Sequence, residues 1–368
     1  MKIAVYGIGY YSDHFLERLK RATRKVDIVY FVESVKTKEE FHGCVVKTAT
    51  EMNPDDFDYL VIAVINHDVI WDYIKEALDC YEQLEPKILI MSQFLHIITR
   101  SPGGIYPYGS VKLSCGLSYI FDSEDRCIGY SMVVSGENYA RGLIDSFFVL
   151  TDKYYGARKR TGIFMDIGAN IGTTAIYVKK IVNPYLNVIG IEAGKKNFDI
   201  FRINCIINDV ESICIENVGF GDKNKDMNYC YCIDNPGGSG VVENKVEGAE
   251  NVRVITMDSY CDRNGIAAKD IDYIWMDTEG FEAQIIEGGK SIFSEVKIPL
   301  LQEFNPTTYR KRGVLSEYCK LMNEYYDSFI DMMDYERGNY QLRNIGELFD
   351  YSKKMEMEGR LQADLFFA

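Results

Sequence analysis

The sequence predicts an α/β protein with two domains, each a parallel sheet with helices on both faces. Strand-sized apolar runs alternate with helix-sized amphipathic runs along most of the 368 residues. This length suffices for two hydrophobic cores, and 47% of the residues are hydrophobic. A glycine turn follows the first apolar run of each half, as in Rossmann-like folds. We therefore expect two Rossmann-like domains.

The first domain is expected over residues 1–100. Its predicted strands, with helices between them, cover residues 2–6, 27–33, 58–65 and 87–91. Gly7, Gly9 and Ser12 form a glycine loop directly after the first strand, and Glu33 ends the second strand. This arrangement leaves two alternatives open: a structural turn without a ligand, or a site for a nucleotide or nucleotide-sugar.

Residues 101–160 are expected to connect the two domains. Ser-Pro-Gly-Gly at residues 101–104 indicates a linker, and the Tyr-, Ser- and Gly-rich stretch after it predicts irregular structure or short strands. A helix is expected after Ser135, because apolar residues recur at helical spacing over residues 143–150. The hydroxyl of Ser135 is a candidate cap for this helix.

The second domain is expected over residues 161–368. Its core strands are predicted at residues 162–168, 186–193, 213–220, 271–277 and 298–304. Helices are predicted after most of these strands, including one that ends at Gly288 and Gly289. The apolar run at residues 363–368 predicts a C-terminal strand that lies in the sheet.

Charge and hydropathy exclude several classes of protein. The net charge is −14, with acidic residues spread along the chain, so a nucleic acid partner is not expected. The N-terminus lacks the pattern of a signal peptide, and the longest apolar runs are too short to cross a bilayer. We therefore expect a cytoplasmic protein without a membrane span.

The strongest candidate for a cofactor site is the turn Asp166-Ile-Gly168-Ala-Asn170-Ile-Gly172. It follows an apolar strand and opens a helix, where glycines let the backbone approach a ligand closely. Its spacing differs from the GxGxxG of pyrophosphate-binding loops and suits a cofactor with an amino-acid carboxylate and ammonium. Glu192 ends the next strand, where a carboxylate can accept both ribose hydroxyls of an adenosine.

A second candidate site follows the strand at 271–277. Asp277 and Glu279 lie at the carboxyl end of this strand, and Glu303 ends the next one. They are candidates for contacting substrate, for accepting a proton or for holding a divalent cation. All four histidines precede residue 100, so a proton acceptor in the second domain must be another group. No His or Cys pattern indicates zinc.

Several of these segments, in order, resemble the FkbM family of S-adenosylmethionine-dependent methyltransferases. The resemblance covers about residues 161–304 and is carried by FMDIGANIGTT, GIEA, NVGFGD, VITMDSY, IWMDTEGFE and LLQEF. It implies a class I methyltransferase-type sheet in the second domain, S-adenosyl-L-methionine as cofactor, and a cofactor role for Asp222 in NVGFGD. The sequence departs from the family pattern at Trp275, where Lys is common, and at Ala193, where Pro is common.

The family is associated with O-methylation of sugars and natural products, which implies a hydroxyl acceptor and a role in polysaccharide biosynthesis. The main hypothesis is an O-methyltransferase that acts on a saccharide or glycosylated metabolite. One alternative is a non-catalytic binding or scaffold protein in glycan assembly. Another is an NAD-dependent sugar oxidoreductase, although the first domain lacks a Tyr-x-x-x-Lys motif.

Overall fold

The chain forms two compact units, each described here by itself. The computed structural model describes residues 1–20, 25–64, 66–91, 93–95, 108–123, 125, 127–157, 161–230, 240–242 and 249–368. The first unit comprises Met1–Ser114 and Phe121–Glu137, and the second comprises Cys115–Ile120 and Asn138–Ala368. Residues 121–137 thus group with the N-terminal sheet, whereas the residues on either side of them belong to the C-terminal unit.

The N-terminal unit is built on a six-stranded sheet of order β3-β4-β2-β1-β5-β6. Its strands are β1 (Lys2–Tyr6), β2 (Asp27–Glu33), β3 (Glu40–Phe41), β4 (Cys44–Thr48), β5 (Tyr59–Ile62) and β6 (Ile88–Ile90). From β4 to β6 neighbouring strands run parallel, and β3 is antiparallel to β4. The expected α/β architecture is confirmed, and β3 and β4 are strands that the sequence analysis missed.

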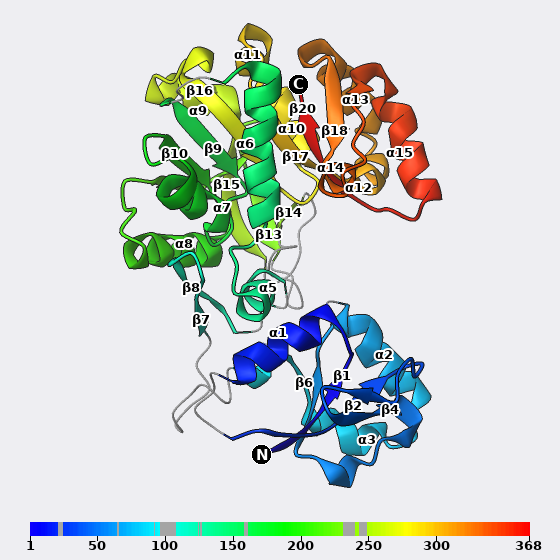
Figure 1. Ribbon diagram of the computed structural model, residues 1–368. Coiled ribbons are helices and arrows are strands. Elements are labelled where there is room, and N and C mark those ends of the chain that lie inside the picture. The colour runs from blue at the N-terminus through cyan, green and yellow to red at the C-terminus, as the bar shows by residue number, and fades with distance from the viewer. Residues whose placement is uncertain are drawn as a thin grey trace. The chain divides into compact units, whose positions relative to one another are not determined.

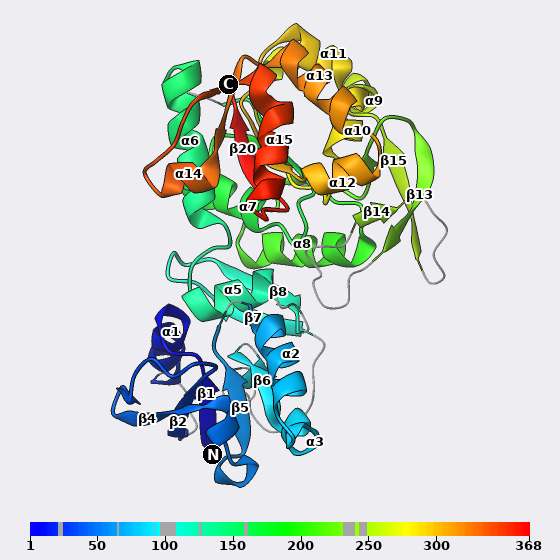
Figure 2. The same cartoon turned by 90° about the vertical axis from the view of Figure 1, so that its right-hand side faces the viewer.

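Helices cover both faces of this sheet (Figure 2). Side chains alternate along β1, so Val5 packs with Phe15 on one face and Tyr6 packs with Ile74 on the other. The helices are α1 (Tyr10–Leu19) and α5 (Ile128–Ser135) on the first face, and α2 (His67–Ala77) and α3 (Tyr81–Leu84) on the second. Short 3-10 helices are η1 (Ala49–Glu51), η2 (Pro54–Asp56) and η3 (Glu85–Lys87).

The prediction that Ser135 caps the start of a helix is wrong. Ser135 is the last residue of α5, and Gly136 ends that helix in the left-handed conformation with φ of 72°. The next helix, α6, runs over Arg141–Tyr155. Before α5, β7 (Tyr108–Lys112) and β8 (Ser118–Asp122) form a two-stranded sheet.

The C-terminal unit is built on an eight-stranded sheet of order β11-β10-β9-β16-β17-β20-β18-β19 (Figure 1). Its strands are β9 (Ile163–Ile167), β10 (Asn187–Ile191), β11 (Cys214–Glu216), β16 (Ile271–Met276), β17 (Leu300–Phe304), β18 (Ser328–Asp331), β19 (Arg343–Asn344) and β20 (Ala363–Phe367). The five strands from β11 to β17 in this order run parallel, and β20 is antiparallel to both β17 and β18. The predicted C-terminal strand in the sheet is confirmed.

Helices cover both faces of this sheet as well. On one face, Phe147 of α6 contacts the rings of Tyr273, Trp275 and Phe366. The remaining helices are α7 (Thr173–Tyr177), η4 (Val178–Val182), α8 (Lys195–Ile207), α9 (Met257–Asn264), η6 (Ala268–Asp270), α10 (Glu282–Gly288), α11 (Lys290–Glu295), α12 (Pro306–Lys311), α13 (Leu315–Tyr325), α14 (Met332–Glu336), η7 (Ile345–Glu347) and α15 (Leu348–Met357). None of the helices in the described residues combines the length and apolar character needed to cross a membrane.

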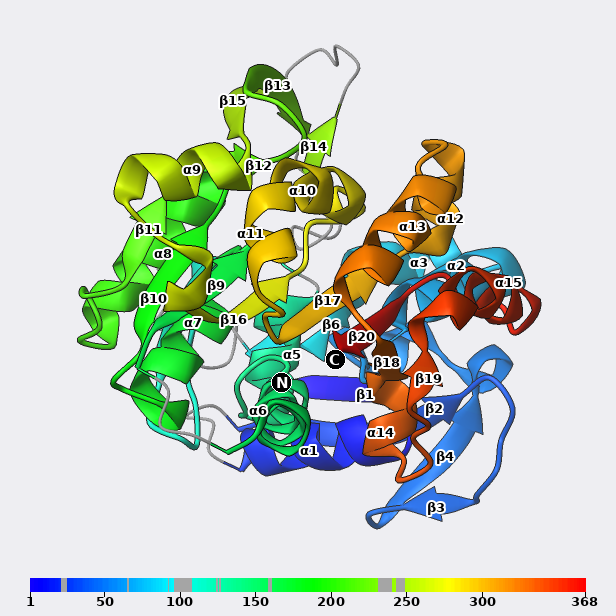
Figure 3. The same cartoon turned by 90° about the horizontal axis from the view of Figure 1, so that it is seen from above.

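A small second sheet of order β12-β15-β13-β14 lies beside α9 and α10 (Figure 3). Its strands are β12 (Gly219–Phe220), β13 (Lys225–Cys230), β14 (Gly240–Val242) and β15 (Glu250–Ile255). The single strand predicted at 213–220 is thus divided, because β11 joins the large sheet and β12 pairs with β15. The buried side chains of the small sheet belong to the same hydrophobic core as β16 and α10.

Candidate functional site

A cavity that opens to solvent lies in the C-terminal unit, at the carboxyl ends of its central strands. β9 has β10 on one side and β16 on the other, so the chain direction of the crossovers reverses here. Such a switch point is where ligands bind in open α/β sheets. The lining residues come from β9, β10, the small sheet and the loop after β16: Ile167, Gly168, Asn170, Ile191, Glu192, Ala193, Val218, Gly219, Phe220, Tyr229, Gly240, Val241, Asp277, Thr278, Glu279 and Phe281.

The glycine turn after β9 brings two backbone segments into close approach. The amides of Gly168 and Ala169 both donate to the carbonyl oxygen of Ile191, at 2.9 and 3.0 Å. Gly168 has φ of 84°, and a Cβ there would lie 1.8 Å from the carbonyl oxygen of Asp277. Only glycine fits this position, so the turn fixes the end of β9 against the ends of both β10 and β16.

Asp166 and Gly172 do not line the cavity, and they instead hold the turn in its conformation. Asp166 is buried, and its Oδ2 accepts a hydrogen bond of 3.0 Å from the Ala175 amide in the first turn of α7. Burial raises the pKa of Asp166 to about 7. Gly172 has φ of 85°, and a Cβ there would lie 2.0 Å from the ring of Phe201. Both residues thus set the path of the chain around Asn170.

Glu192 lies opposite the glycine turn and lines the cavity. Its Oε2 accepts from the Asn170 amide at 2.8 Å, and Asn170 has a left-handed φ of 50°. Its Oε1 accepts from the Gly194 amide at 2.7 Å and from the Tyr229 hydroxyl at 3.3 Å. Burial raises the pKa of Glu192 to about 7, and these three donors favour its charged form. Oε2 keeps a lone pair that can accept a ligand hydroxyl.

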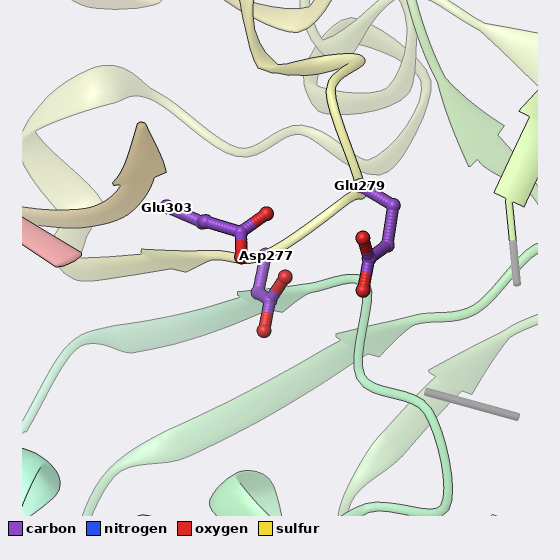
Figure 4. A group of neighbouring side chains, drawn as sticks. All are labelled: Asp277, Glu279 and Glu303. Carbon is purple, nitrogen blue, oxygen red and sulfur yellow. The ribbon is translucent and has the colours of Figure 1, made fainter. Parts of the chain in front are cut away.

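Asp277, Glu279 and Glu303 converge beside the glycine turn (Figure 4). One carboxylate oxygen of each residue lies within 4.8 Å of those of the other two. Asp277 follows β16 and lines the cavity, with its amide bonded to the Ile167 carbonyl oxygen at 3.0 Å. Glu279 reaches the group through a left-handed turn with φ of 54°, and Glu303 extends from the neighbouring strand β17. The structure therefore brings all three predicted catalytic residues together.

Burial and neighbouring carboxylates raise the pKa of all three groups. Burial and the nearby Asp277 raise the pKa of Glu303 to about 11, and burial and Glu282 raise the pKa of Glu279 to about 7. Asp277 opens onto the cavity, yet the protein around it displaces water and Glu279 lies near, so its pKa is well above the usual range. At neutral pH the group therefore holds at least one proton or needs a cation to become fully ionised.

Glu282 has a structural role that separates it from the triad of Asp277, Glu279 and Glu303. It is fully buried at the start of α10, and its Oε1 accepts from the Thr278 amide and hydroxyl, each at 2.9 Å, and from the Gly280 amide at 3.2 Å. Its Oε2 accepts from the Tyr309 hydroxyl at 2.8 Å. These four bonds hold the loop after β16 in the conformation that presents the triad.

Two other residues singled out in the sequence lie away from the cavity lining. Asp222 pairs with Lys223 at 3.6 Å and with Lys225 at 3.4 Å, at the entrance to β13. Trp275 is buried in β16, and its ring packs edge-on against Phe147 at 5.9 Å between centroids. Trp275 thus belongs to the core on one face of the sheet and is not among the residues that line the cavity.

Tyr229 is a site residue that the sequence analysis missed. It lies on β13, 37 residues after Glu192, and becomes its neighbour only because the small sheet packs over the end of β10. The sequence around Tyr229 gave no signal for this contact, because β13 is placed by its pairing with β15, whose residues lie more than 20 positions further along the chain.

Several polar groups around the glycine loop of the N-terminal unit are bonded within that unit. The Ser12 hydroxyl donates to the Gly7 carbonyl oxygen at 2.8 Å, and Glu33 accepts from the Thr37 amide at 2.8 Å. Tyr130 of α5 donates to the Val64 carbonyl oxygen at 3.0 Å and stacks on His67, with ring centroids 5.3 Å apart.

Comparison with known proteins agrees with the C-terminal architecture. Residues 166–342 match the family model of the methyltransferase FkbM domain. The C-terminal unit thus contains a methyltransferase-like domain, and the residues that line the cavity lie within the matched range. A search of curated proteins gave no match.

Several solved structures are similar at low identity. Methyltransferase FkbM from Methylobacillus flagellatus KT is 14% identical over 100% of this chain and 90% of its own, with a TM-score of 0.36. TYW2 of P. horikoshii in complex with MeSAdo is 13% identical over 72% of this chain and 73% of its own, with a TM-score of 0.34. An O-methyltransferase from Bacillus cereus in complex with SAH is 12% identical over 53% of this chain and 72% of its own, with a TM-score of 0.30.

Proposed function

We propose that this protein is an S-adenosyl-L-methionine-dependent O-methyltransferase that acts on a hydroxyl of a saccharide or glycosylated metabolite. One observation carries the proposal: a single cavity joins the glycine turn and Glu192 to the carboxylates of Asp277 and Glu279. A cofactor and an acceptor can therefore meet there. The match of residues 166–342 to the methyltransferase FkbM domain supports the same conclusion.

In this proposal the cofactor lies along the carboxyl ends of β9 and β10. Glu192 accepts hydrogen bonds from the ribose hydroxyls through the free lone pair on Oε2, next to the bond it already accepts from Asn170. The apolar lining from Ile191, Val218 and Phe220 suits an adenine ring. The methyl group then points toward the loop after β16.

The acceptor hydroxyl is placed beside Asp277 and Glu279. Its oxygen attacks the methyl carbon in line with the departing sulfur, the carbon–sulfur bond breaks, and S-adenosylhomocysteine leaves as the neutral thioether. The hydroxyl proton passes to a carboxylate oxygen of Asp277 or Glu279. Burial and neighbouring carboxylates make these two groups stronger bases than isolated ones, and the Glu279 pKa of about 7 suits proton transfer near neutral pH.

The proposal is tested by following the labelled methyl group of S-adenosylmethionine into a panel of oligosaccharides and glycosylated metabolites. We expect label in a methyl ether of at least one acceptor, together with one equivalent of S-adenosylhomocysteine. The control is Glu192→Gln, which keeps the shape of the side chain and lowers incorporation by weakening cofactor binding. Label transferred to a nitrogen or carbon acceptor, and to no hydroxyl, would contradict the proposal.

A further inference from the structure

The acidic triad presents more negative charge than a proton acceptor requires. A general base needs one carboxylate, whereas three converge here from the end of β16, the turn after it and β17. The charged residues that line the cavity in the described part of the chain are Glu192, Asp277 and Glu279, all acidic. A positively charged ligand would therefore be attracted to this cavity.

Glu303 points to the identity of that partner. It is 94% buried, and its side chain extends from β17 toward Asp277 (Figure 4). Its Oε2 has no hydrogen-bond partner among the described residues. A buried carboxylate oxygen without a partner loses its hydration and gains nothing in return, which is costly unless a ligand satisfies it. The structural carboxylate Glu282 differs, because it accepts four hydrogen bonds from the protein and both of its oxygens have partners.

The geometry of the three oxygens matches one hard cation. Ca²⁺ binds oxygen at about 2.4 Å and Mg²⁺ at about 2.1 Å, so two ligand oxygens of one ion lie up to about 4–5 Å apart. The three oxygens here lie within 4.8 Å of one another. The donor set contains only carboxylates, which hard divalent cations prefer and which zinc sites rarely use alone.

We propose that Asp277, Glu279 and Glu303 bind a hard divalent cation, such as Mg²⁺, Mn²⁺ or Ca²⁺, through one oxygen each. Water and the acceptor hydroxyl would complete its coordination from the cavity side, where Asp277 and Glu279 are accessible. The role of this ion in methyl transfer rests on the proposed function. There it offsets the negative charge that develops on the acceptor oxygen. A carboxylate bound through one oxygen keeps its second oxygen to accept the hydroxyl proton.

The test measures Mn²⁺ binding to the full chain after treatment with EDTA and desalting, with free Mn²⁺ followed by electron paramagnetic resonance. We expect one site with a dissociation constant no weaker than about 1 mM, the weak end for oxygen-ligated Ca²⁺. Glu303→Gln removes a ligand charge without changing shape and should weaken binding at least about tenfold. Glu279→Gln, on the half-buried turn, should act in the same direction.

Asp364→Asn is the matched control. Asp364 lies opposite Glu303 on β20 and contributes charge to the triad without belonging to the group of three. It should change Mn²⁺ affinity less than threefold. Absence of Mn²⁺ binding, or equal affinity in wild type and Glu303→Gln, would overturn the cation site. Calorimetry with S-adenosylhomocysteine on the same samples then judges the proposed function separately, because cofactor binding requires Glu192 and no triad residue.

Discussion

The two units carry the same local pattern, a strand, a glycine turn and a helix, with an acidic residue at the end of the next strand. In the C-terminal unit, Glu192 turns toward its glycine turn and accepts from the Asn170 amide at 2.8 Å. In the N-terminal unit, Glu33 accepts instead from the Thr37 amide at 2.8 Å, four residues further along its own strand end. The hydrogen-bond partner of the acidic side chain therefore distinguishes these two regions, although the local pattern alone allows a site in both.

The polar groups around the two turns also differ in whether they face open space. Beside Gly168 the chain leaves an open cavity, lined by Glu192 and two triad carboxylates. Beside Gly7 the chain's own polar groups are bonded to one another, with Ser12 donating to the Gly7 carbonyl oxygen and Tyr130 donating to that of Val64. A glycine turn indicates a ligand site only when the surrounding polar groups remain directed toward open space.

The largest effect is expected from Gly168→Ala. A Cβ at this position would lie 1.8 Å from the Asp277 carbonyl oxygen, so β9 and the loop after β16 must move apart. We expect the free energy of unfolding to fall by about 3 kcal/mol or more, measured by urea denaturation. The control is Gly265→Ala, which has φ of 64° and open space around the new Cβ and should cost about 1 kcal/mol. Equal losses would show that close approach at Gly168 is unimportant.

Removal of one triad charge is expected to affect chemistry more than cofactor binding. Asp277→Asn and Glu279→Gln keep the shape of the side chains, and at least one should lower turnover by about 100-fold, the scale of a lost general base. Affinity for S-adenosylhomocysteine should stay within a few-fold, because neither residue contacts Glu192. If both variants turn over at the wild-type rate, the proton leaves by another route.

Turnover at saturating cofactor should rise with pH and level off above about pH 7. The Glu279 pKa is raised from 4.5 to about 7, and only the ionised carboxylate accepts a proton. The folded state thus holds this proton more tightly than the unfolded chain, so the free energy of unfolding falls as pH rises from about 4.5 to about 7. Glu279→Gln should remove the pH dependence of turnover and weaken that of the free energy of unfolding, to which Asp166 and Glu192, with pKa values of about 7, also contribute. A wild-type pH profile of turnover in this variant would exclude Glu279 as its source.

The smallest effect is expected from Tyr229→Phe. The Tyr229 hydroxyl donates to Glu192 Oε1 at 3.3 Å, while the Gly194 amide donates to the same oxygen at 2.7 Å. Loss of the weaker bond should cost about 0.5–1.5 kcal/mol, or a few-fold in affinity for S-adenosylhomocysteine by calorimetry. Tyr260→Phe, on α9, serves as the control and should leave that affinity unchanged. A loss above about 20-fold would mean that Tyr229 contacts the cofactor directly.

Local patterns predicted much of this molecule. The turn from Asp166 to Gly172 and the acidic strand end at Glu192 are neighbours in sequence or in adjacent parallel strands, so strand order alone brings them together. Asp277 and Glu279 were expected to converge because alternate residues of an extended strand share a face. They do converge, but through the left-handed turn at Glu279, which the pattern could not show.

Features that depend on distant pairing could not be predicted. Tyr229 comes close to Glu192 only when β13 pairs with β15, which lies about 20 residues later in the sequence. β18, with four residues between helices, is too short to show a period, and β20 holds it in the sheet. The contrasting partners of Glu33 and Glu192 depend on which backbone amides lie nearby after folding, so the sequence left a ligand at the N-terminal loop as an open alternative.

The central claim is that the C-terminal glycine turn binds the cofactor and the N-terminal loop does not. Calorimetry of S-adenosylhomocysteine binding to the full-length wild type, Glu192→Ala and Glu33→Ala tests it most directly. We predict one site per chain, a loss of roughly 10- to 150-fold in Glu192→Ala from a charge-assisted contact of about 1.5–3 kcal/mol, and a change of less than about twofold in Glu33→Ala. Unchanged affinity in Glu192→Ala, or a comparable loss in Glu33→Ala, would contradict the claim.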